Sequence, residues 1–162
     1  HAAHERVLFE RLREGGGRIA IQQLLLPEVV SLSAAEYELA LAQLERFEEI
    51  GFHVEPFGDA SVAIRATPAL LPHLDPRRTL LDILGELAEL PGTVKPQEQR
   101  EKLYALLACK GAIKAHAPLT PAEVEALCRD LDAIPFASTC PHGRPTWVVI
   151  GARDLEKMFK RS

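Results

Sequence analysis

The sequence predicts an α+β fold, and three observations indicate it. Several stretches carry leucine and isoleucine at helical spacing, two short β-branched runs flank a glycine turn, and capping signals mark helix starts. The chain has 162 residues, enough to bury a core without disulfides. Hydrophobic residues make up 47%, yet no apolar run reaches the roughly 18 residues of a membrane span. We therefore expect one soluble domain or a compact pair of subdomains, with no membrane partner.

The first helix is predicted over residues 2–13, where Ala3, Val7 and Leu8 give it an apolar face. The glycine run at 15–17 ends it, because glycine permits the φ angles of a turn. A strand is expected over residues 18–21.

A capping box predicts the next helix. Ser33 is the expected N-cap, Glu36 follows three residues later, and the apolar stripe continues to Phe47 before the helix ends at Gly51. Residues 52–55 and 61–65 then predict a hairpin with a loop longer than two residues. The first half of the chain therefore contains a helix-plus-hairpin unit.

The second half is mostly helical. Apolar spacing predicts helices over residues 79–90 and 97–114. A second capping box, Thr120 with Glu123, starts a helix that runs to about Asp132.

Two expectations concern the C-terminal third. Cys128 lies in an amphipathic helical pattern and is expected to be a small core residue. Residues 146–150, T-W-V-V-I, form a β-branched run typical of a buried or central strand, and residues 154–160 predict a last helix. The three cysteines are odd in number and widely spaced, which favours a reducing compartment such as the cytoplasm over a disulfide framework.

A metal-ligand pattern stands near the C-terminus. Cys140 and His142 offer a thiolate and an imidazole two residues apart, in a turn stiffened by prolines. At the other end His1 and Glu5 are four residues apart and share a helical face. Together they would form a mixed oxygen, nitrogen and sulfur site with open positions, which suggests catalysis. An isolated Cys-x-His pair also arises by chance, so the residues alone leave this site open.

The neighbouring polar residues admit two interpretations. Glu10 lies about 140° round the helix from Glu5, which favours a solvated or structural carboxylate over a ligand. His4 either orients a ligand carboxylate or lies at the surface. His53 and His73 have no companion ligands nearby in the sequence and are expected to be structural.

Several motifs resemble the MutL family of DNA mismatch-repair proteins. Residues 1–10, H-A-A-H-E-R-V-L-F-E, match the greater part of the family's endonuclease motif D-Q-H-A-x-x-E-x-x-x-x-E. Residues 108–114, A-C-K-G-A-I-K, resemble its A/S-C-K helix motif, and residues 140–145 read C-P-H-G-R-P, like its cysteine turn. Residues 22–27, Q-Q-L-L-L-P, match the Q-x-L-L-x-P sliding-clamp motif of its C-terminal domains.

The resemblance implies a fold in two parts and a metal-dependent activity. Residues 1–17 and 97–162 would form a discontinuous dimerisation and endonuclease subdomain, with residues 18–96 inserted as a regulatory subdomain. The implied activity is nicking of DNA by phosphodiester hydrolysis, with Zn²⁺ and/or Mn²⁺ as cofactors. The implied metal ligands are His1, Glu5, Cys140 and His142, with Glu5 and His1 as the catalytic pair. The residues expected near this site are His4, Glu10, Cys109 and Lys110.

The resemblance also implies partners. They are a second copy of the chain, the replication sliding clamp, DNA, a mismatch-recognition protein, and the N-terminal ATPase region of the same protein. The residues expected to bind the clamp are Gln22, Leu24, Leu25 and Pro27, and those expected to hold DNA phosphates are Arg144, Lys110 and Lys114. The net charge of −4 argues against a strongly basic nucleic-acid clamp, so we expect this domain alone to bind DNA weakly.

The family motif places an Asp and a Gln just before the position of His1. A chain that opens on histidine is expected to be a fragment, here of a bacterial, nucleoid-associated protein. Without that Asp, a second metal position would lack a carboxylate. The alternative function is therefore a non-catalytic dimerisation and clamp-binding scaffold with a structural zinc, and a third possibility is a regulatory domain that binds a small ligand and no metal.

Overall fold

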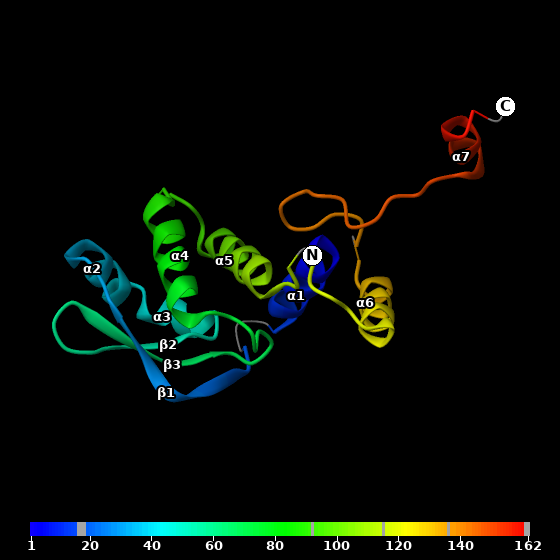
Figure 1. Cartoon of the computed structure of the whole chain (residues 1–162). Helices are drawn as coiled ribbons and strands as arrows, with labels where there is room; N and C mark the ends of the chain where they lie inside the picture. The colour runs from blue at the N-terminus through cyan, green and yellow to red at the C-terminus, as the bar shows by residue number, and fades with distance from the viewer. Residues whose placement is uncertain (16–18, 92, 115, 136, 161–162) are drawn as a thin grey trace.

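The structure of the chain, a computed structural model, describes residues 1–15, 19–91, 93–114, 116–135 and 137–160. These residues form a mixed arrangement of helices around a small antiparallel sheet (Figure 1). The predicted α+β class is confirmed. The helices α2, α3 and α4 lie over the sheet at one end, α1 and α5 lie in the middle, and α6 and α7 extend toward the C-terminus (Figure 1).

The described residues form one sheet of three strands in the order β1-β3-β2. They are β1 (Ile21–Ser31), β2 (His53–Pro56) and β3 (Ser61–Pro68), and β3 pairs antiparallel with both neighbours. The predicted hairpin is therefore confirmed as β2 and β3. Strand β3 is central and almost continuously buried, whereas β1 is an edge strand.

Edge strand β1 begins later than the strand predicted over residues 18–21, and Arg18 lies outside the described residues. Its pairing with β3 is interrupted between Gln23 and Glu28. Residues 24–27 therefore leave the regular ladder, which matters for the candidate clamp segment below.

The helix predicted from Ser33 is two helices, α2 (Ala34–Ala42) and α3 (Leu44–Glu49). Its capping box is confirmed: the Ser33 hydroxyl accepts from the Glu36 N–H, and the Glu36 carboxylate accepts from the Ser33 N–H at 2.8 Å. The single-helix expectation is wrong at Gln43, whose N–H donates three residues back, to the Ala40 carbonyl at 3.2 Å. This tighter turn redirects the chain so that Phe47 is fully buried.

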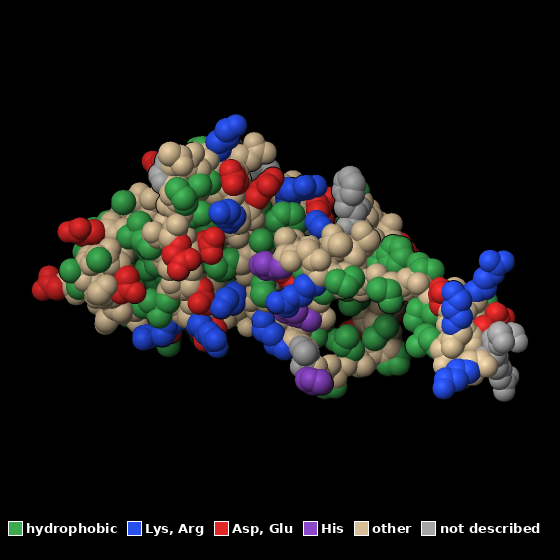
Figure 2. Space-filling view, turned by 90° about the horizontal axis from the view of Figure 1, so that it is seen from above, with side chains coloured by type: hydrophobic (Ala, Val, Ile, Leu, Met, Phe, Trp, Pro, Cys, Tyr) green, Lys and Arg blue, Asp and Glu red, His purple; other side chains and the backbone are tan. Residues whose placement is uncertain are grey.

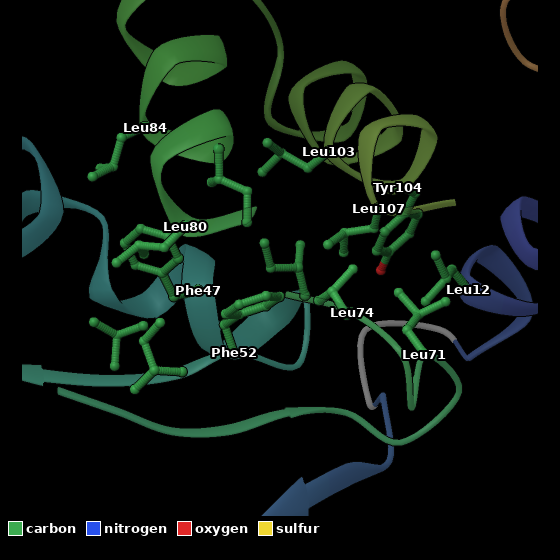
Figure 3. Close-up of a cluster of buried hydrophobic side chains, with 14 of the residues drawn as sticks. Leu12, Phe47, Phe52, Leu71, Leu74, Leu80, Leu84, Leu103, Tyr104 and Leu107 are labelled. Atoms are coloured by element: carbon green, nitrogen blue, oxygen red, sulfur yellow. The ribbon is translucent and has the colours of Figure 1, made fainter. Parts of the chain in front are cut away.

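Helices α4 (Pro76–Glu89) and α5 (Pro96–Gly111) supply much of the core. Figure 3 shows Leu80 of α4 beside Phe47, and Leu103 and Leu107 of α5 on the side of the same cluster that holds Leu74 and Tyr104. One cluster of buried side chains joins α1, the sheet, α4 and α5. The division into subdomains 1–17 with 97–162 and 18–96 stays a prediction.

Helix α1 (Ala2–Glu14) confirms the first predicted helix and packs against α5 and α6 (Pro121–Ala133). Its buried face includes Val7, Leu8 and Leu12, as the apolar spacing indicates. The turn expected after it falls partly on residues 16 and 17, which lie outside the described part of the chain.

Two C-terminal expectations are wrong. Residues 146–150 form no strand, and Trp147, Val148, Val149 and Ile150 are 52–79% exposed. A strand needs a neighbour for its ladder, and among the described residues of this segment only Thr146 has a backbone partner, its N–H donating to the Ser138 carbonyl at 3.0 Å. Cys128 is exposed, since α6 has no buried residue among those described and its main packing partner is α1. The last helix is confirmed as α7 (Ala152–Met158), at the end of an extended segment (Figure 1).

The surface charge is uneven. Figure 2 shows acidic side chains scattered over the end of this face that carries α2, and histidine, lysine and arginine side chains gathered near its middle. No helix in the described ranges is long and apolar enough to cross a membrane.

Candidate metal centre

Three segments far apart in the sequence meet at the N-terminal end of α1. They are the first turn of α1, the C-terminal turn of α5 with the residues after it, and the turn at residues 140–145. Glu5 lies at their centre and is fully buried, which is costly for a carboxylate that lacks a compensating charge. The packing of α1 against α5 therefore places an acidic group where an uncharged side chain would be less costly.

The first donor group consists of His1, Glu5 and Cys109, whose ligand atoms lie within 4.8 Å of one another. The Nδ1 atom of His1 lies 2.9 Å from the Ile113 carbonyl, and a carbonyl can only accept, so this nitrogen carries the proton. The Nε2 atom therefore keeps its lone pair, and it faces Glu5 Oε2 at 3.8 Å and Cys109 Sγ at 4.0 Å. A histidine held in this tautomer by a carbonyl is the usual arrangement of a metal ligand.

The second donor group consists of Glu5, Cys140 and His142, whose ligand atoms also lie within 4.8 Å of one another. Glu5 Oε1 contacts His142 Nδ1, and Cys140 is only 2% exposed. The turn is closed by backbone hydrogen bonds from Cys140 N to Arg144 O, 2.8 Å, and from Gly143 N to Cys140 O, 2.9 Å. Gly143 has φ +80°, which only glycine adopts readily, so the turn that joins the thiol and the imidazole depends on it.

Glu5 is shared by both groups through different oxygens. Its Oε1 faces His142, while its Oε2 is buried and has no hydrogen-bond partner among the described residues. Buried carboxylate oxygens are normally paired, and an unpaired one beside an imidazole lone pair and a thiol fits a cation ligand. The donor set of oxygen, nitrogen and sulfur suits Zn²⁺ in particular.

This geometry differs in one respect from a single site made by the two chain ends. His1 stands in one donor group, Cys140 and His142 stand in the other, and Glu5 joins them. Cys109, expected only near the site, belongs to the first group. The A-C-K motif was the only sequence signal for it, because spacing along the chain could not show that α5 ends beside His1.

His4 holds the segment after α5 and does not touch Glu5. Its Nδ1 accepts from the Ile113 N–H at 3.1 Å, so the two histidines of the first turn bind the N–H and the carbonyl of the same residue. Burial lowers the pKa of His4, the charge of Arg11 adds to the effect, and the neutral form is the one that can accept this hydrogen bond.

Glu10 belongs to neither donor group. It is 2% exposed, and its two oxygens pair with Arg6 Nη1 and Arg13 Nη2, each at 2.8 Å. Arg6 also donates from Nε to the Thr139 carbonyl at 2.5 Å, one residue before Cys140. Glu10 is therefore a structural carboxylate that fixes Arg6, and Arg6 in turn fixes the cysteine turn against α1.

Comparison with known proteins identifies the family of the chain. A family model described as the MutL C terminal dimerisation domain matches residues 1–119. The chain belongs to the MutL family. The resemblance read from the motifs is thus confirmed.

The relatives extend the match to the C-terminal residues. A DNA mismatch repair protein MutL from Syntrophus aciditrophicus is 47% identical, and the alignment covers 99% of this chain and 26% of the relative. Proteins of the same name from Caulobacter vibrioides and Azotobacter vinelandii are 40% and 37% identical, with 99% of this chain covered and 26% and 25% of the relatives. The chain spans about a quarter of the length of the curated relatives it matches.

The three cations expected to hold DNA phosphates lie in different surroundings. Lys110 pairs with Asp82 of α4. Lys114 Nζ donates to the carbonyls of Cys109 and Lys110 at the end of α5, at 2.9 and 3.0 Å, and so lies beside the first donor group. Arg144 is exposed in the cysteine turn, beside the second donor group.

The segment expected to bind the clamp is exposed rather than buried in the fold. Leu25 is 98% and Leu26 is 80% exposed, while Leu24 packs partly against the core. Gln22 still pairs with Thr67 of β3, and Pro27 is exposed. Residues 22–27 therefore do not form a buried edge strand, which would be the structural alternative to a clamp-binding segment, because Leu25 and Leu26 are exposed.

Proposed function

We propose that this chain is the metal-dependent, DNA-nicking C-terminal domain of a mismatch-repair protein, and that it homodimerises and docks on the replication sliding clamp. The observation that carries the nuclease part is the buried carboxylate of Glu5, which is shared by two donor groups and whose Oε2 has no hydrogen bond among the described residues, its contact with His1 Nε2 being 3.8 Å. A structural carboxylate would be expected to have arginine partners, as Glu10 has.

The residues that would hold the cofactor are those of the two donor groups. His1 and Cys109 stand on one side of Glu5, and Cys140 and His142 on the other. Bound Zn²⁺ or Mn²⁺ would supply Lewis-acid polarisation of a phosphate oxygen and a water of lowered pKa. Thiols and imidazoles favour Zn²⁺, whereas a carboxylate and open positions suit Mn²⁺.

The chain's own residues would prepare this chemistry. The Ile113 carbonyl favours the Nδ1–H tautomer of the neutral His1 ring, which leaves the Nε2 lone pair for a ligand bond, and the Arg6 guanidinium holds the cysteine turn in place. Lys114 and Arg144 lie beside the two donor groups, where they could hold a phosphodiester by charge-assisted hydrogen bonds. Burial of Glu5 excludes bulk water from the acidic group and strengthens its attraction for cations.

Nicking of supercoiled plasmid in Mn²⁺ tests the nuclease proposal. Glu5→Gln should reduce the nicking rate by roughly a hundredfold or more, since loss of a residue that only orients a ligand already costs about 10- to 100-fold. Glu14→Gln is a matched control, because Glu14 is an exposed glutamate of the same helix. An unchanged nicking rate in Glu5→Gln would contradict the nuclease proposal.

The dimerisation part rests on the C-terminal arm, residues 146–159. The family model is described as a dimerisation domain, and this arm exposes Trp147, Val149 and Ile150 together with Met158 and Phe159 of the last helix. Contiguous exposed apolar side chains mark interaction surfaces. A second copy of the chain is the occupant we propose.

The clamp part rests on Leu25 and Leu26, which project from an interrupted edge strand. An extended apolar segment of this kind can fill a groove on a partner while its backbone pairs with a strand edge. Replacing Gln22 and Leu24 by alanine should abolish stimulation of nicking by the clamp. Stimulation that persists would assign the segment a structural role.

The full protein would add partners that act through other regions. Since this chain spans about a quarter of its relatives' length, an N-terminal ATPase region and a mismatch-recognition protein would act outside it. The competing proposal is a non-catalytic scaffold with a structural zinc, which the net charge of −4 favours. A zinc-dependent dimer that never nicks DNA in Mn²⁺ would support the scaffold.

A further inference from the structure

A pocket of about 320 Å³ opens beside the first donor group, between α4 and the end of α5. Its lining residues are His73, Asp75, Arg78, Thr79, Cys109, Lys110 and Lys114. Cys109 lies both in this pocket and in the donor group with His1 and Glu5, so the two spaces are adjacent.

The pocket carries positive charge in a chain that is negative overall. Three cations, Arg78, Lys110 and Lys114, and one carboxylate, Asp75, line it, against a net charge of −4 for the chain. Asp75 is engaged as the N-cap of α4, where it accepts from the Arg78 N–H at 2.9 Å. Figure 2 shows lysine, arginine and histidine side chains gathered near the middle of one face, in contrast to the acidic end.

The three cations of the pocket differ in whether their charged groups already have ion-pair or hydrogen-bond partners. Lys110 pairs with Asp82, and Lys114 rests on the carbonyls at the end of α5. Arg78 is exposed on the first turn of α4 and lines the pocket. The neighbouring Arg77 points elsewhere, because it donates to Glu28 and to the Val29 carbonyl of β1.

We propose that this pocket binds a backbone phosphate of DNA next to the one to be hydrolysed, with Arg78 and Lys114 as its main contacts and Lys110 and His73 as its walls. This inference rests on the proposed function, since it names the path by which the substrate reaches Glu5. A guanidinium and an ammonium facing one cavity match a phosphodiester, which offers two anionic oxygens. Such contacts position a strand without reading its sequence.

DNA binding by the metal-free chain separates this inference from nuclease activity. Fluorescence anisotropy of a labelled duplex in EDTA, at several salt concentrations, gives the affinity and its salt dependence. Arg78→Ala should weaken binding by roughly two- to fivefold at low salt, as for a partly exposed ion pair. It should also reduce the slope of log affinity against log salt by about one. Arg77→Ala is the matched control and should change neither quantity.

Further variants and a second ligand make the result decisive. Arg78→Lys should recover part of the affinity, and Arg78→Ala with Lys114→Ala should lose more than either change alone, with melting temperature as the check on folding. The proposal is overturned if Arg78→Ala leaves both the affinity for DNA and its salt slope unchanged. It is also overturned if the wild-type chain has no affinity for DNA. The proposal is also overturned if Arg78→Ala changes the binding of inorganic phosphate but leaves the affinity for DNA unchanged. If binding depends on Arg78 but no nicking occurs in Mn²⁺, the pocket stands and the nuclease proposal fails.

Discussion

At the scale of single residues, Glu5 shows what the sequence could and could not predict. Its spacing from His1 on one helix predicted a shared face, the Cys-x-His spacing indicated Cys140 and His142, and the motif resemblance supported these four residues as one ligand set. The arrangement into two donor groups depends on where α5 and the cysteine turn pack against α1, and no local pattern encodes that. Cys109 belongs to the first donor group for the same reason, because the packing of α5 against α1 brings it beside His1 and Glu5.

Zinc should stabilise the folded chain through Glu5. A ligand that binds only the folded state at about 100 times its dissociation constant adds about 2.7 kcal/mol. Differential scanning calorimetry in EDTA and in ZnCl₂ should show this rise for the wild-type chain and for Glu14→Gln. Glu5→Gln should lose most of it, and an equal rise in that variant would remove Glu5 from the metal centre.

Arg6 should matter for both the fold and the metal centre. Its side chain joins buried Glu10 to the Thr139 carbonyl, so Arg6→Ala leaves one oxygen of the Glu10 carboxylate without its cation, with Arg13 still on the other, and releases the cysteine turn. Removing one partner of a buried ion pair costs about 3 kcal/mol, which urea unfolding of the metal-free chain can measure.

The role of Arg6 in the turn needs a second readout. Cobalt absorption reports thiolate coordination, and Arg6→Lys should weaken cobalt binding because an ammonium does not reproduce the two-sided guanidinium contact. Full cobalt affinity in Arg6→Lys would mean that Arg6 does not position Cys140.

At the scale of elements, helices whose starts are marked by capping residues were predicted correctly. Features that depend on contacts with distant parts of the chain were not. Both capping boxes, at Ser33 and Thr120, start helices where the sequence indicates. The break at Gln43 and the absence of a strand at 146–150 in the described chain depend on tertiary contacts, which β-branched composition alone does not report.

The Ser33 capping box should contribute a pH-dependent part of stability. Ser33→Ala should cost about 1 kcal/mol at neutral pH, measured by urea unfolding. Hydrogen bonds from the Ser33 hydroxyl and N–H lower the pKa of Glu36 below its ordinary value of 4.5. A lowered folded-state pKa means that the contribution is complete above pH 4.5 and is lost as the pH falls through the folded value. The Ser33→Ala deficit should therefore shrink in acid, and a deficit that is constant with pH would contradict this role for Glu36.

At the scale of the whole molecule, we propose that separate parts of the surface serve separate partners. The C-terminal arm is apolar and exposed, the interrupted edge strand presents two leucines, and the metal centre combines residues from the two ends of the chain with Cys109 of α5. Val149→Asp should convert a dimer into a monomer in light scattering, because a charge would be buried in the interface. Leu25→Asp is the matched control: it should leave the dimer intact and abolish clamp binding. Loss of the dimer in Leu25→Asp, or its persistence in Val149→Asp, would contradict this assignment.

The most direct test of the metal centre is a crystal structure of the metal-loaded chain with anomalous scattering at the zinc and manganese edges. The account predicts anomalous density within coordination distance of Glu5, shared either with His1 and Cys109 or with Cys140 and His142, and at both positions when two ions bind. The account would be contradicted by an ion bound to Cys140 and His142 but not to Glu5, or by the absence of anomalous density near Glu5 at saturating metal.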